Sequence, residues 1–287
     1  MASILETTQP HPKLPDFDYE SKLWGAHEVR ISPTYLGALR LRYCLEDLEG
    51  VRGRVLEVGC GGGGMVRALK SYRPDLEVLG CDLSRSATRV AGDRSSDVDY
   101  AVANAYHLPY ASGSLAAYVM FDVLEHVDDP RQVLLEAHRL LAPEGVLHMF
   151  VPCEGELHTL HGLLARLGWR AKEQYGGHIQ RFTMKSLREL VSELGFGISR
   201  ARWSAHLFNQ IVDVAYFTAI SIVGKNPPTS VEGYLESANG NLIPRMIGVI
   251  KRGVAGLSFY ESKHLARVPA SGVHIAGVKR SIASGAE

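Results

Sequence analysis

The sequence predicts an α/β protein whose sheet is mostly parallel and carries helices on both faces. Strand and helix signals alternate from Arg54 to Val151, which is typical of strands joined by crossover helices. A glycine-rich run from Gly59 to Gly64 stands where the first of these strands gives way to a helix. The chain of 287 residues is 46% hydrophobic, which is ample for one core domain with an added subdomain.

Residues 1–50 are predicted to form an arm and helices that precede the sheet. Residues 1–17 carry three prolines and few apolar anchors, which is typical of an extended arm. From Tyr19 to Leu48 the apolar residues recur at helical spacing, which predicts one or two helices, and Gly50 then ends them.

Residues 51–205 are predicted to be the core of alternating strands and helices. Short apolar runs bounded by turn residues favour buried parallel strands. Ser84 and Thr183 stand where helix N-caps are expected, and Pro130 suits a first helical turn. The strands are predicted at 54–58, 76–81, 98–103, 117–121, 146–151 and 198–205, with helices at 65–71, 84–91, 130–141 and 183–194 and a turn at 143–145.

Residues 206–267 interrupt this alternation with two apolar helical stretches, at 207–223 and 242–257. We predict a helical cap on the core. An apolar substrate pocket with a homodimer contact and a membrane-surface helix are the alternatives, and Lys251-Arg252 is a thin basic face for the latter. Residues 268–287 are predicted to hold the last core strand, at 272–278, and a tail.

Charge and cysteine usage narrow the function. Lys+Arg and Asp+Glu each number 31, so nothing in the net charge favours a nucleic-acid partner. The four cysteines form no CxxC pair, which favours reduced thiols in a cytoplasmic enzyme. The first residues do not resemble a signal peptide. The longest apolar stretch, 207–223, contains polar residues and is shorter than the roughly 20 residues that span a membrane, so we expect no stable membrane insertion.

The glycine loop indicates a cofactor site. Glu57 precedes the glycines directly, as E-x-G-x-G-x-G, whereas the dinucleotide fingerprint G-x-G-x-x-G lacks this acid. An acid here suits a cationic ligand such as S-adenosylmethionine, which carries a sulfonium and an ammonium group. Asp82 closes the second predicted strand, where a carboxylate can accept both hydroxyls of a ribose. No P-loop pattern occurs.

The stretch from Val55 to Val151 resembles the class I methyltransferases, and it is similar to the ubiquinone and menaquinone biosynthesis group among them. The resemblance implies a Rossmann-like sheet of seven strands, a methyltransferase activity and S-adenosylmethionine as the cofactor. It rests on Glu57-Val-Gly-Cys-Gly-Gly-Gly63, Gly80-Cys-Asp82, Asn104-Ala-Tyr-His-Leu-Pro-Tyr110, Phe121-Asp-Val-Leu-Glu-His-Val-Asp-Asp-Pro130, Glu136-Ala-His-Arg-Leu-Leu-Ala-Pro-Glu-Gly145 and Gly177-His-Ile-Gln-Arg-Phe-Thr183.

The resemblance also implies which residues surround the cofactor. The glycines pass under its methionine end, the acids take its amino group and ribose, and the residues after the second and third strands take its adenine. Asn104 stands where the family usually has Asp, and its amide can still bond the adenine edge. The implied set is Glu57, Gly59, Gly61, Gly63, Asp82, Leu83, Asn104, Ala105 and Phe121.

Acceptor residues follow from the chemistry of methyl transfer, which mainly aligns nucleophile and methyl group and needs a base only for a protonated acceptor. The candidate catalytic residues are His126, His178 and Asp122, and the candidate substrate residues are Tyr19, Trp24 and Tyr35. Packing roles are the alternative for each. A divalent cation held by Asp122, Glu125, His126 and His178 is a further alternative, although we predict no metal.

These observations predict a cytoplasmic methyltransferase that acts on oxygen or carbon of a small, moderately apolar acceptor. The pattern of Asp or Asn followed by Pro-Pro and an aromatic residue, typical of N-methylation, is absent after the fourth predicted strand. A dinucleotide oxidoreductase and a non-catalytic cofactor-binding module are the alternative functions.

Overall fold

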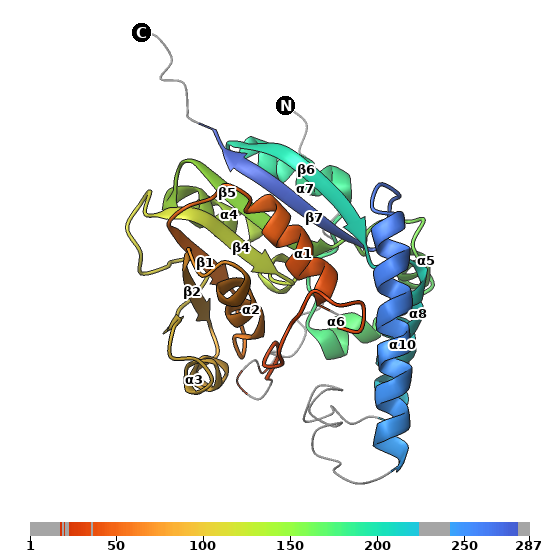
Figure 1. The fold of residues 1–287 in the computed structure, drawn as a ribbon. Helices are drawn as coiled ribbons and strands as arrows, with labels where there is room; N and C mark the ends of the chain where they lie inside the picture. The colour runs from red at the N-terminus through yellow and green to blue at the C-terminus, as the bar shows by residue number, and fades with distance from the viewer. Residues whose placement is uncertain (1–17, 19, 21–22, 36, 224–241, 281–287) are drawn as a thin grey trace, which may run out of the picture.

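The computed structural model describes residues 18, 20, 23–35, 37–223 and 242–280, with residues 223 and 242–251 described by their backbone alone. Its centre is a seven-stranded sheet in the order β3-β2-β1-β4-β5-β7-β6 (Figure 1). The sheet confirms the predicted Rossmann-like α/β class. The strands are β1 (Arg54–Val58), β2 (Glu77–Asp82), β3 (Asp99–Val102), β4 (Leu115–Phe121), β5 (Leu141–Pro152), β6 (Phe196–Ser204) and β7 (Gly272–Lys279).

The parallel part of the sheet brings several strand ends to one edge. β1 pairs with β2 and β4 in parallel, so that Val58 lies beside Cys81 and Met120 near the end of each strand. The loops that follow β1, β2 and β4 therefore leave the sheet at the same edge, where α/β proteins bind their ligands. Only β7 runs antiparallel, between β5 and β6.

Helices cover both faces of the sheet (Figure 1). On one face, α1 and α2 bury Leu41 and Leu69 against β1 and β4. On the other face, α4 and α7 bury Leu134 and Leu187. The helices are α1 (Ala38–Asp47), α2 (Gly64–Tyr72), α3 (Arg85–Asp93), α4 (Pro130–Leu140), α5 (Leu160–Arg166), α6 (Ala171–Gly176), α7 (Met184–Glu193), α8 (Leu207–Val223) and α10 (Leu242–His264), with a 3-10 turn, η1, at Leu124–His126.

The expected helix starts are confirmed. The Ser84 hydroxyl accepts the backbone N–H of Ala87 at the start of α3, and Thr183 accepts that of Ser186 in a capping box at the start of α7. Pro130 occupies the first turn of α4. Local chemistry therefore sets where these helices begin.

Three local details differ from the sequence prediction. Residues 23–35 form turns and bends rather than a helix, and α1 begins only at Ala38. The predicted turn at 143–145 lies inside β5, where Glu144 takes a positive φ of 61°. The short helices α5 and α6 were not predicted, because one or two turns carry too little periodicity to read.

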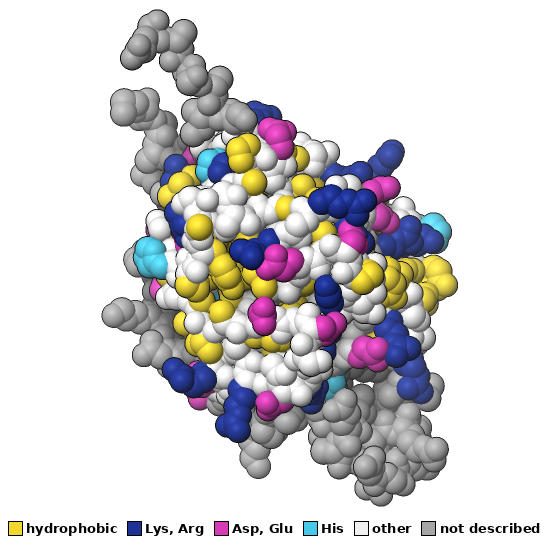
Figure 2. Space-filling model, turned by 60° about the vertical axis from the view of Figure 1, so that its left-hand side comes forward, with side chains coloured by type: hydrophobic (Ala, Val, Ile, Leu, Met, Phe, Trp, Pro, Cys, Tyr) yellow, Lys and Arg dark blue, Asp and Glu magenta, His cyan; other side chains and the backbone are white. Residues whose placement is uncertain are grey.

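The segment after β6 contains the two expected helical stretches, α8 and α10. Their helices lie alongside each other (Figure 1). α10 packs on α1, where Phe259 joins Ala38, Leu39 and Tyr43 in a small apolar cluster. Among the described residues no helix is long and apolar enough to cross a membrane. On the face shown in Figure 2, basic and acidic side chains are interspersed.

Candidate functional site

The glycine loop after β1 takes a conformation that favours glycine. Gly59, Gly61 and Gly63 have φ of +74°, +52° and +75°, which other residues rarely adopt. A Cβ at Gly59 would also lie 2.6 Å from Val123 Cγ2, next to the end of β4. The loop therefore packs directly against the segment that carries Asp122 and His126.

An N-terminal strap, residues 24–27, lies on this loop. Gly62 donates its N–H to the Trp24 carbonyl at 2.7 Å, and Gly64 donates to the Gly25 carbonyl at 2.6 Å. A Cβ at Gly61 would overlap the carbonyl of Trp24. The strap therefore also requires glycine at position 61, a reason that the sequence does not reveal.

Two arginines hold the strap. Arg67 Nη2 and Arg94 Nη1 both donate to the Ala26 carbonyl, at 2.8 and 2.7 Å. Further towards the N-terminus, the Glu20 carboxylate accepts the backbone N–H groups of Arg85 and Ser86 at the start of α3. These hydrogen bonds lower the pKa of Glu20 to about 2. Glu20 and the strap are thus fixed to the elements on both sides of the loop.

Asp82 lies at the end of β2, within reach of the glycine loop. Its Oδ2 accepts the N–H of Gly61 at 2.7 Å, and its Oδ1 accepts the N–H of Ser84 at 2.9 Å. These bonds fix the carboxylate plane and leave each oxygen a second lone pair. The neighbouring Leu83 side chain is 58% exposed, so it has free apolar surface for a planar ring.

Glu57 is a buried acid with an unsatisfied oxygen. Its side chain is 3% exposed, and its Oε2 has no hydrogen-bond partner among the described residues. Burial raises the pKa of Glu57 well above the usual value, and the charge of Asp82 adds to the rise. A cationic group beside this carboxyl would favour its ionised form, which fits the ammonium of the expected cofactor.

The remaining expected cofactor residues fall into two groups. Asn104 and Ala105 follow β3, and the Asn104 side chain accepts the N–H of Tyr106 at 3.0 Å, so that its amide is held in a turn. Phe121 ends β4 but is buried in the core, where its ring lies 5.5 Å from that of His148. A cofactor role for these residues stays a prediction.

Two of the candidate catalytic residues form a pair. The rings of His126 and His178 lie 4.8 Å apart, edge to face, and the Trp24 ring stacks on His126 at 6.1 Å. His126 Nδ1 is 3.0 Å from the Gly177 carbonyl. Burial lowers the pKa of His126 to about 3, with His178 adding to the effect. Trp24 thus connects the glycine loop with the histidine pair.

Glu125 completes a cluster that could hold a divalent cation. One ligand atom from each of Glu125, His126 and His178 lies within 4.8 Å of the others. Glu125 is fully buried, neither of its oxygens has a hydrogen-bond partner among the described residues, and burial raises its pKa well above the usual value. Carboxylate and imidazole ligands suit several divalent metals. The sequence prediction of no metal is left untested.

Asp122, the third candidate catalytic residue, is paired with Arg40 rather than with the two histidines. It takes a φ of +51° directly after β4, and its carboxylate forms an ion pair with Arg40 of α1. Arg40 also lies over the Phe150 ring, 4.1 Å from its centroid. Asp122 therefore ties α1 to the edge of the sheet that carries the site.

The structure places the two described candidate substrate residues, Trp24 and Tyr35, in different parts of the molecule. Trp24 lies at the site, as described above. Tyr35 is half-buried and packs against the cluster between α1 and α10. Tyr19 lies outside the described residues.

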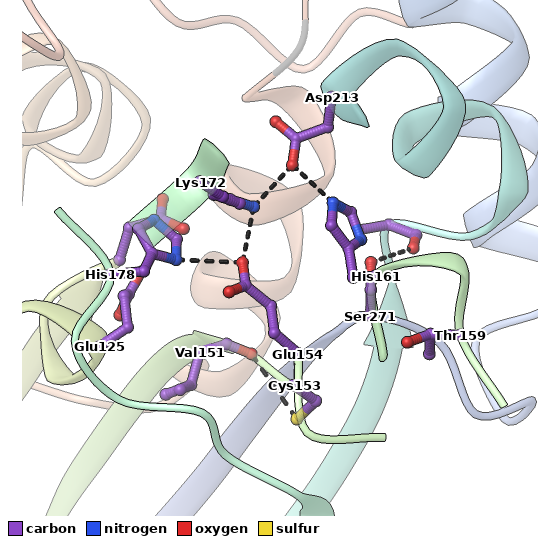
Figure 3. A network of polar contacts seen from close by, with 12 residues as sticks. Glu125, Val151, Cys153, Glu154, Thr159, His161, Lys172, His178, Asp213 and Ser271 are labelled. Atoms are coloured by element: carbon purple, nitrogen blue, oxygen red, sulfur yellow. Dashed lines mark hydrogen bonds and ion pairs between the residues drawn. The ribbon is translucent and has the colours of Figure 1, made fainter. Parts of the chain in front are cut away.

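The site contains four charged or polar residues that sequence analysis missed, joined by a series of ion pairs (Figure 3). Glu154, just after β5, lies 3.0 Å from His178 Nδ1 and 2.8 Å from Lys172 Nζ. Lys172 Nζ lies 2.6 Å from Oδ2 of Asp213, a residue of α8. The same Oδ2 lies 2.9 Å from His161 Nε2. A cavity of about 10 Å³, close to the size of one water, adjoins Glu154, His161 and Lys172.

One of these four residues had a signal in the sequence. Asp213 interrupts an apolar helical stretch three positions after Gln210, so both lie on one face of α8. Gln210 accepts the N–H of Leu160, and Asp213 pairs with α5 and α6 residues. The polar face of α8 is therefore directed at the segment that carries His178. Lys172 and His161 lie on helices too short to predict.

The glycine loop and His126 belong to a segment that matches a known family. A family model for a methyltransferase domain matches residues 56–149. The ubiquinone biosynthesis O-methyltransferase of Vibrio campbellii is 31% identical over 146 residues, which is 47% of this chain and 58% of that protein. The enzyme of the same name from Xanthomonas oryzae pv. oryzae is 34% identical over 134 residues, 45% of this chain and 55% of its own length. This chain thus spans less than two thirds of these relatives.

Solved structures with the same fold include methyltransferases for different atoms. Geranyl diphosphate C-methyltransferase from Streptomyces coelicolor A3(2) has a TM-score of 0.52 at 15% identity, over 84% of this chain and 76% of that one. Phosphoethanolamine N-methyltransferase 2 from Haemonchus contortus has a TM-score of 0.54 at 19% identity, over 85% and 53%. At this identity the likeness concerns the fold alone. Residues 56–149 of this chain match the methyltransferase-domain family, and the chain has the same fold as the solved methyltransferases described above.

Proposed function

We propose that this chain transfers a methyl group from S-adenosylmethionine to an oxygen or carbon of a small acceptor, with a hydroxyl as the preferred acceptor group. The observation that carries the proposal is that Trp24 contacts both the glycine loop, which is suited to the cofactor, and the histidine pair, which is suited to an acceptor. Gly62 bonds the Trp24 backbone, and the Trp24 ring stacks on His126. Residues suited to the cofactor and residues suited to an acceptor are therefore adjacent.

The described residues fit the cofactor at three points. Glu57 offers a buried acid with an unsatisfied oxygen, Asp82 offers a carboxylate held by two backbone N–H groups, and Leu83 offers exposed apolar surface. S-adenosylmethionine would supply an electrophilic methyl group on a good leaving group. The protein then has to align the acceptor and keep water out.

The histidine pair supports a hydroxyl acceptor. A hydroxyl reacts well only if its proton is removed, and a neutral imidazole is the usual base for this step. His178 is 7% exposed and His126 is also largely buried, so water has little access to them. The name of the curated relatives, ubiquinone biosynthesis O-methyltransferase, agrees with methylation of oxygen.

The test combines binding with turnover. Isothermal titration with S-adenosylhomocysteine should show binding, and NAD should show none. Methylation of catechol, a small molecule with two adjacent hydroxyls, is then measured with labelled S-adenosylmethionine, both with magnesium and with EDTA. We expect label in the methyl ether product and loss of at least a hundredfold in kcat for His178→Ala.

The possible failures differ in meaning. NAD binding without S-adenosylhomocysteine binding would favour the dinucleotide oxidoreductase. S-adenosylhomocysteine binding without methylation of any compound in a panel of phenols, carbon acids and amines would favour a non-catalytic cofactor-binding module. A methylated carbon rather than oxygen would correct the acceptor atom alone.

A further inference from the structure

Glu154 occupies a position from which it can act on the histidine pair. It follows β5 by two residues, at the same edge of the sheet as the glycine loop, and its side chain is buried. Its Oε1 lies 2.8 Å from Lys172 Nζ and 3.0 Å from His178 Nδ1. Oε1 has no hydrogen bond of regular geometry among the described residues, although both cationic groups lie within ion-pair distance. The contacts are therefore mainly electrostatic.

Lys172 is held from two sides, which fixes Glu154 in turn. Its ammonium lies between Glu154 and Asp213, and Asp213 also bonds His161 Nε2 at 2.9 Å. Isolated charges of this burial would be very costly, whereas alternating charges compensate one another. The ammonium of Lys172 therefore favours the carboxylate form of Glu154. This series of ion pairs connects the segment after β5 with α5, α6 and α8 (Figure 3).

The position of Glu154 determines which nitrogen of His178 carries a proton, because Nδ1 is the nitrogen that faces the carboxylate. Because Nδ1 faces a carboxylate, the ring gains most by carrying its proton on Nδ1. The lone pair of a neutral ring then lies on Nε2, on the other side of the imidazole. The His126 ring meets that of His178 edge to face at 4.8 Å. An acceptor would therefore meet a nitrogen that can accept a proton or bind a cation.

We propose that Glu154, held in place by Lys172 and Asp213, is a positioning residue that orients His178 in the acceptor site. This role rests on the proposed function, since orientation matters for methylation only if an acceptor reaches His178. It also makes α8 part of the site, because Asp213 anchors Lys172 from that helix. The segment after β6 would then do more than cover the core.

The first test measures the imidazole of His178 itself. Nitrogen NMR of the full chain, with the His178 signals assigned by their loss in His178→Gln, shows which nitrogen carries the proton. We expect the Nδ1–H form in the wild type and a mixture of forms in Glu154→Gln. Glu156→Gln is the matched control, because Glu156 lies two residues away and contacts Met184 N and His158 instead. Unchanged signals in Glu154→Gln would overturn the proposal.

The second test separates positioning from folding and from cofactor binding. For catechol methylation we expect Glu154→Gln and Lys172→Met each to lower kcat by roughly 10- to 100-fold, with Lys172→Arg recovering part of the loss. The Kd for S-adenosylhomocysteine should stay within about twofold of the wild type for all three. If kcat is unchanged while the wild type is active, the positioning role is wrong. If the wild type binds no cofactor, the proposed function fails, and the NMR result still decides whether Glu154 orients His178.

Discussion

Asp82 is the single residue on which cofactor binding should depend most. Its two oxygens accept N–H groups from both the glycine loop and the start of α3, so its carboxylate is already oriented. A ligand hydroxyl can use it without the entropy cost of ordering a side chain. Glu57 differs, because one of its oxygens has no hydrogen-bond partner among the described residues and burial raises its pKa well above the usual value.

Replacing Asp82 by Ala should weaken binding of S-adenosylhomocysteine by about 1–3 kcal/mol, since hydrogen bonds to a charged partner are lost. This corresponds to roughly a 5- to 150-fold rise in Kd, measured by isothermal titration. Asp93→Ala, at the exposed end of α3, should leave Kd unchanged. Equal Kd values for Asp82→Ala and the wild type would place the ribose elsewhere.

The aromatic contact between the strap and the histidine pair can be tested in the same way. Trp24→Ala removes a ring that stacks on His126 and is itself 40% exposed, so the fold should tolerate the change. We expect a rise in KM for the acceptor of about tenfold, with the cofactor Kd changed less. A change in cofactor Kd alone would assign Trp24 to the cofactor half of the site.

Single residues also show how far a sequence can be interpreted. The glycines stand in a contiguous pattern whose chemistry can be recognised, Asp82 ends the next predicted strand, and His126 stands in a motif shared with known families. Glu154 and Lys172 are 18 positions apart and meet only because α6 folds back over the end of β5. Nothing local marks such a pair, so only the structure reveals it.

At the scale of elements, α1 is fixed to the sheet by a buried polar cluster. Asp47 at its end contacts His148 of β5 at 2.9 Å and forms an ion pair with Arg202 of β6. His274 of β7 lies beside His148 and Tyr43, is 1% exposed, and has no hydrogen-bond partner for either nitrogen among the described residues. Burial lowers the pKa of His274 well below its usual value, and the nearby His148 adds to the effect.

This cluster predicts a loss of stability in mild acid. His274 stays neutral in the folded chain, whereas in the unfolded chain it takes up a proton as the pH falls below about 6.5. The contribution of neutral His274 to the free energy of unfolding is therefore fully present above that pH. Below it, this contribution declines by up to about 1.4 kcal/mol per pH unit. Urea unfolding between pH 7.5 and 5 should give a shallower pH slope for His274→Phe than for the wild type.

The control for this experiment is an exposed histidine. His264 ends α10, is exposed, and its Nδ1 lies 2.7 Å from the Tyr260 carbonyl of the same helix, so His264→Phe should keep the wild-type slope. Identical slopes for His274→Phe and the wild type would mean that His274 is protonated in the folded chain or that its surroundings rearrange. Either result would contradict the burial on which this prediction depends.

Elements with strong local chemistry could be predicted from the sequence. Helices with caps and long periodic runs, such as α4 and α7, begin within one residue of their predicted positions. The strap could not be predicted, because its conformation is set by hydrogen bonds to the glycine loop and to two distant arginines. α5 and α6 are short and depend on contacts with α8.

At the scale of the whole molecule, the strap links the N-terminal segment to α2, α3 and the histidine pair. Replacing both Arg67 and Arg94 by Met frees the Ala26 carbonyl of its two donors. Hydrogen exchange should then become at least tenfold faster at the amides of Gly62 and Gly64, which bond the strap. Arg89→Met, on the exposed side of α3, is the control and should leave these amides protected.

Addition of S-adenosylhomocysteine should slow exchange at the same two amides in the wild type if the strap closes over the cofactor. Faster exchange on addition would instead show that S-adenosylhomocysteine displaces the strap.

For the double variant, Arg67→Met with Arg94→Met, unchanged exchange at Gly62 and Gly64 would mean that the glycine loop holds the strap by itself.

The position of β7 has a consequence for how the protein is made. Among the described strands β6 has a hydrogen-bonded neighbour only in β7, and the chain between them, from Ser204 to Gly272, contains α8 and α10. At roughly 5–20 residues per second a ribosome needs about 3–14 s to supply the missing strand. During this interval β7 has not yet been synthesised, so the nascent β6, with the apolar side chains of Phe196 and Trp203, has no strand to pair with. Binding by a general chaperone should therefore be strongest on ribosome-bound chains that end between these two strands.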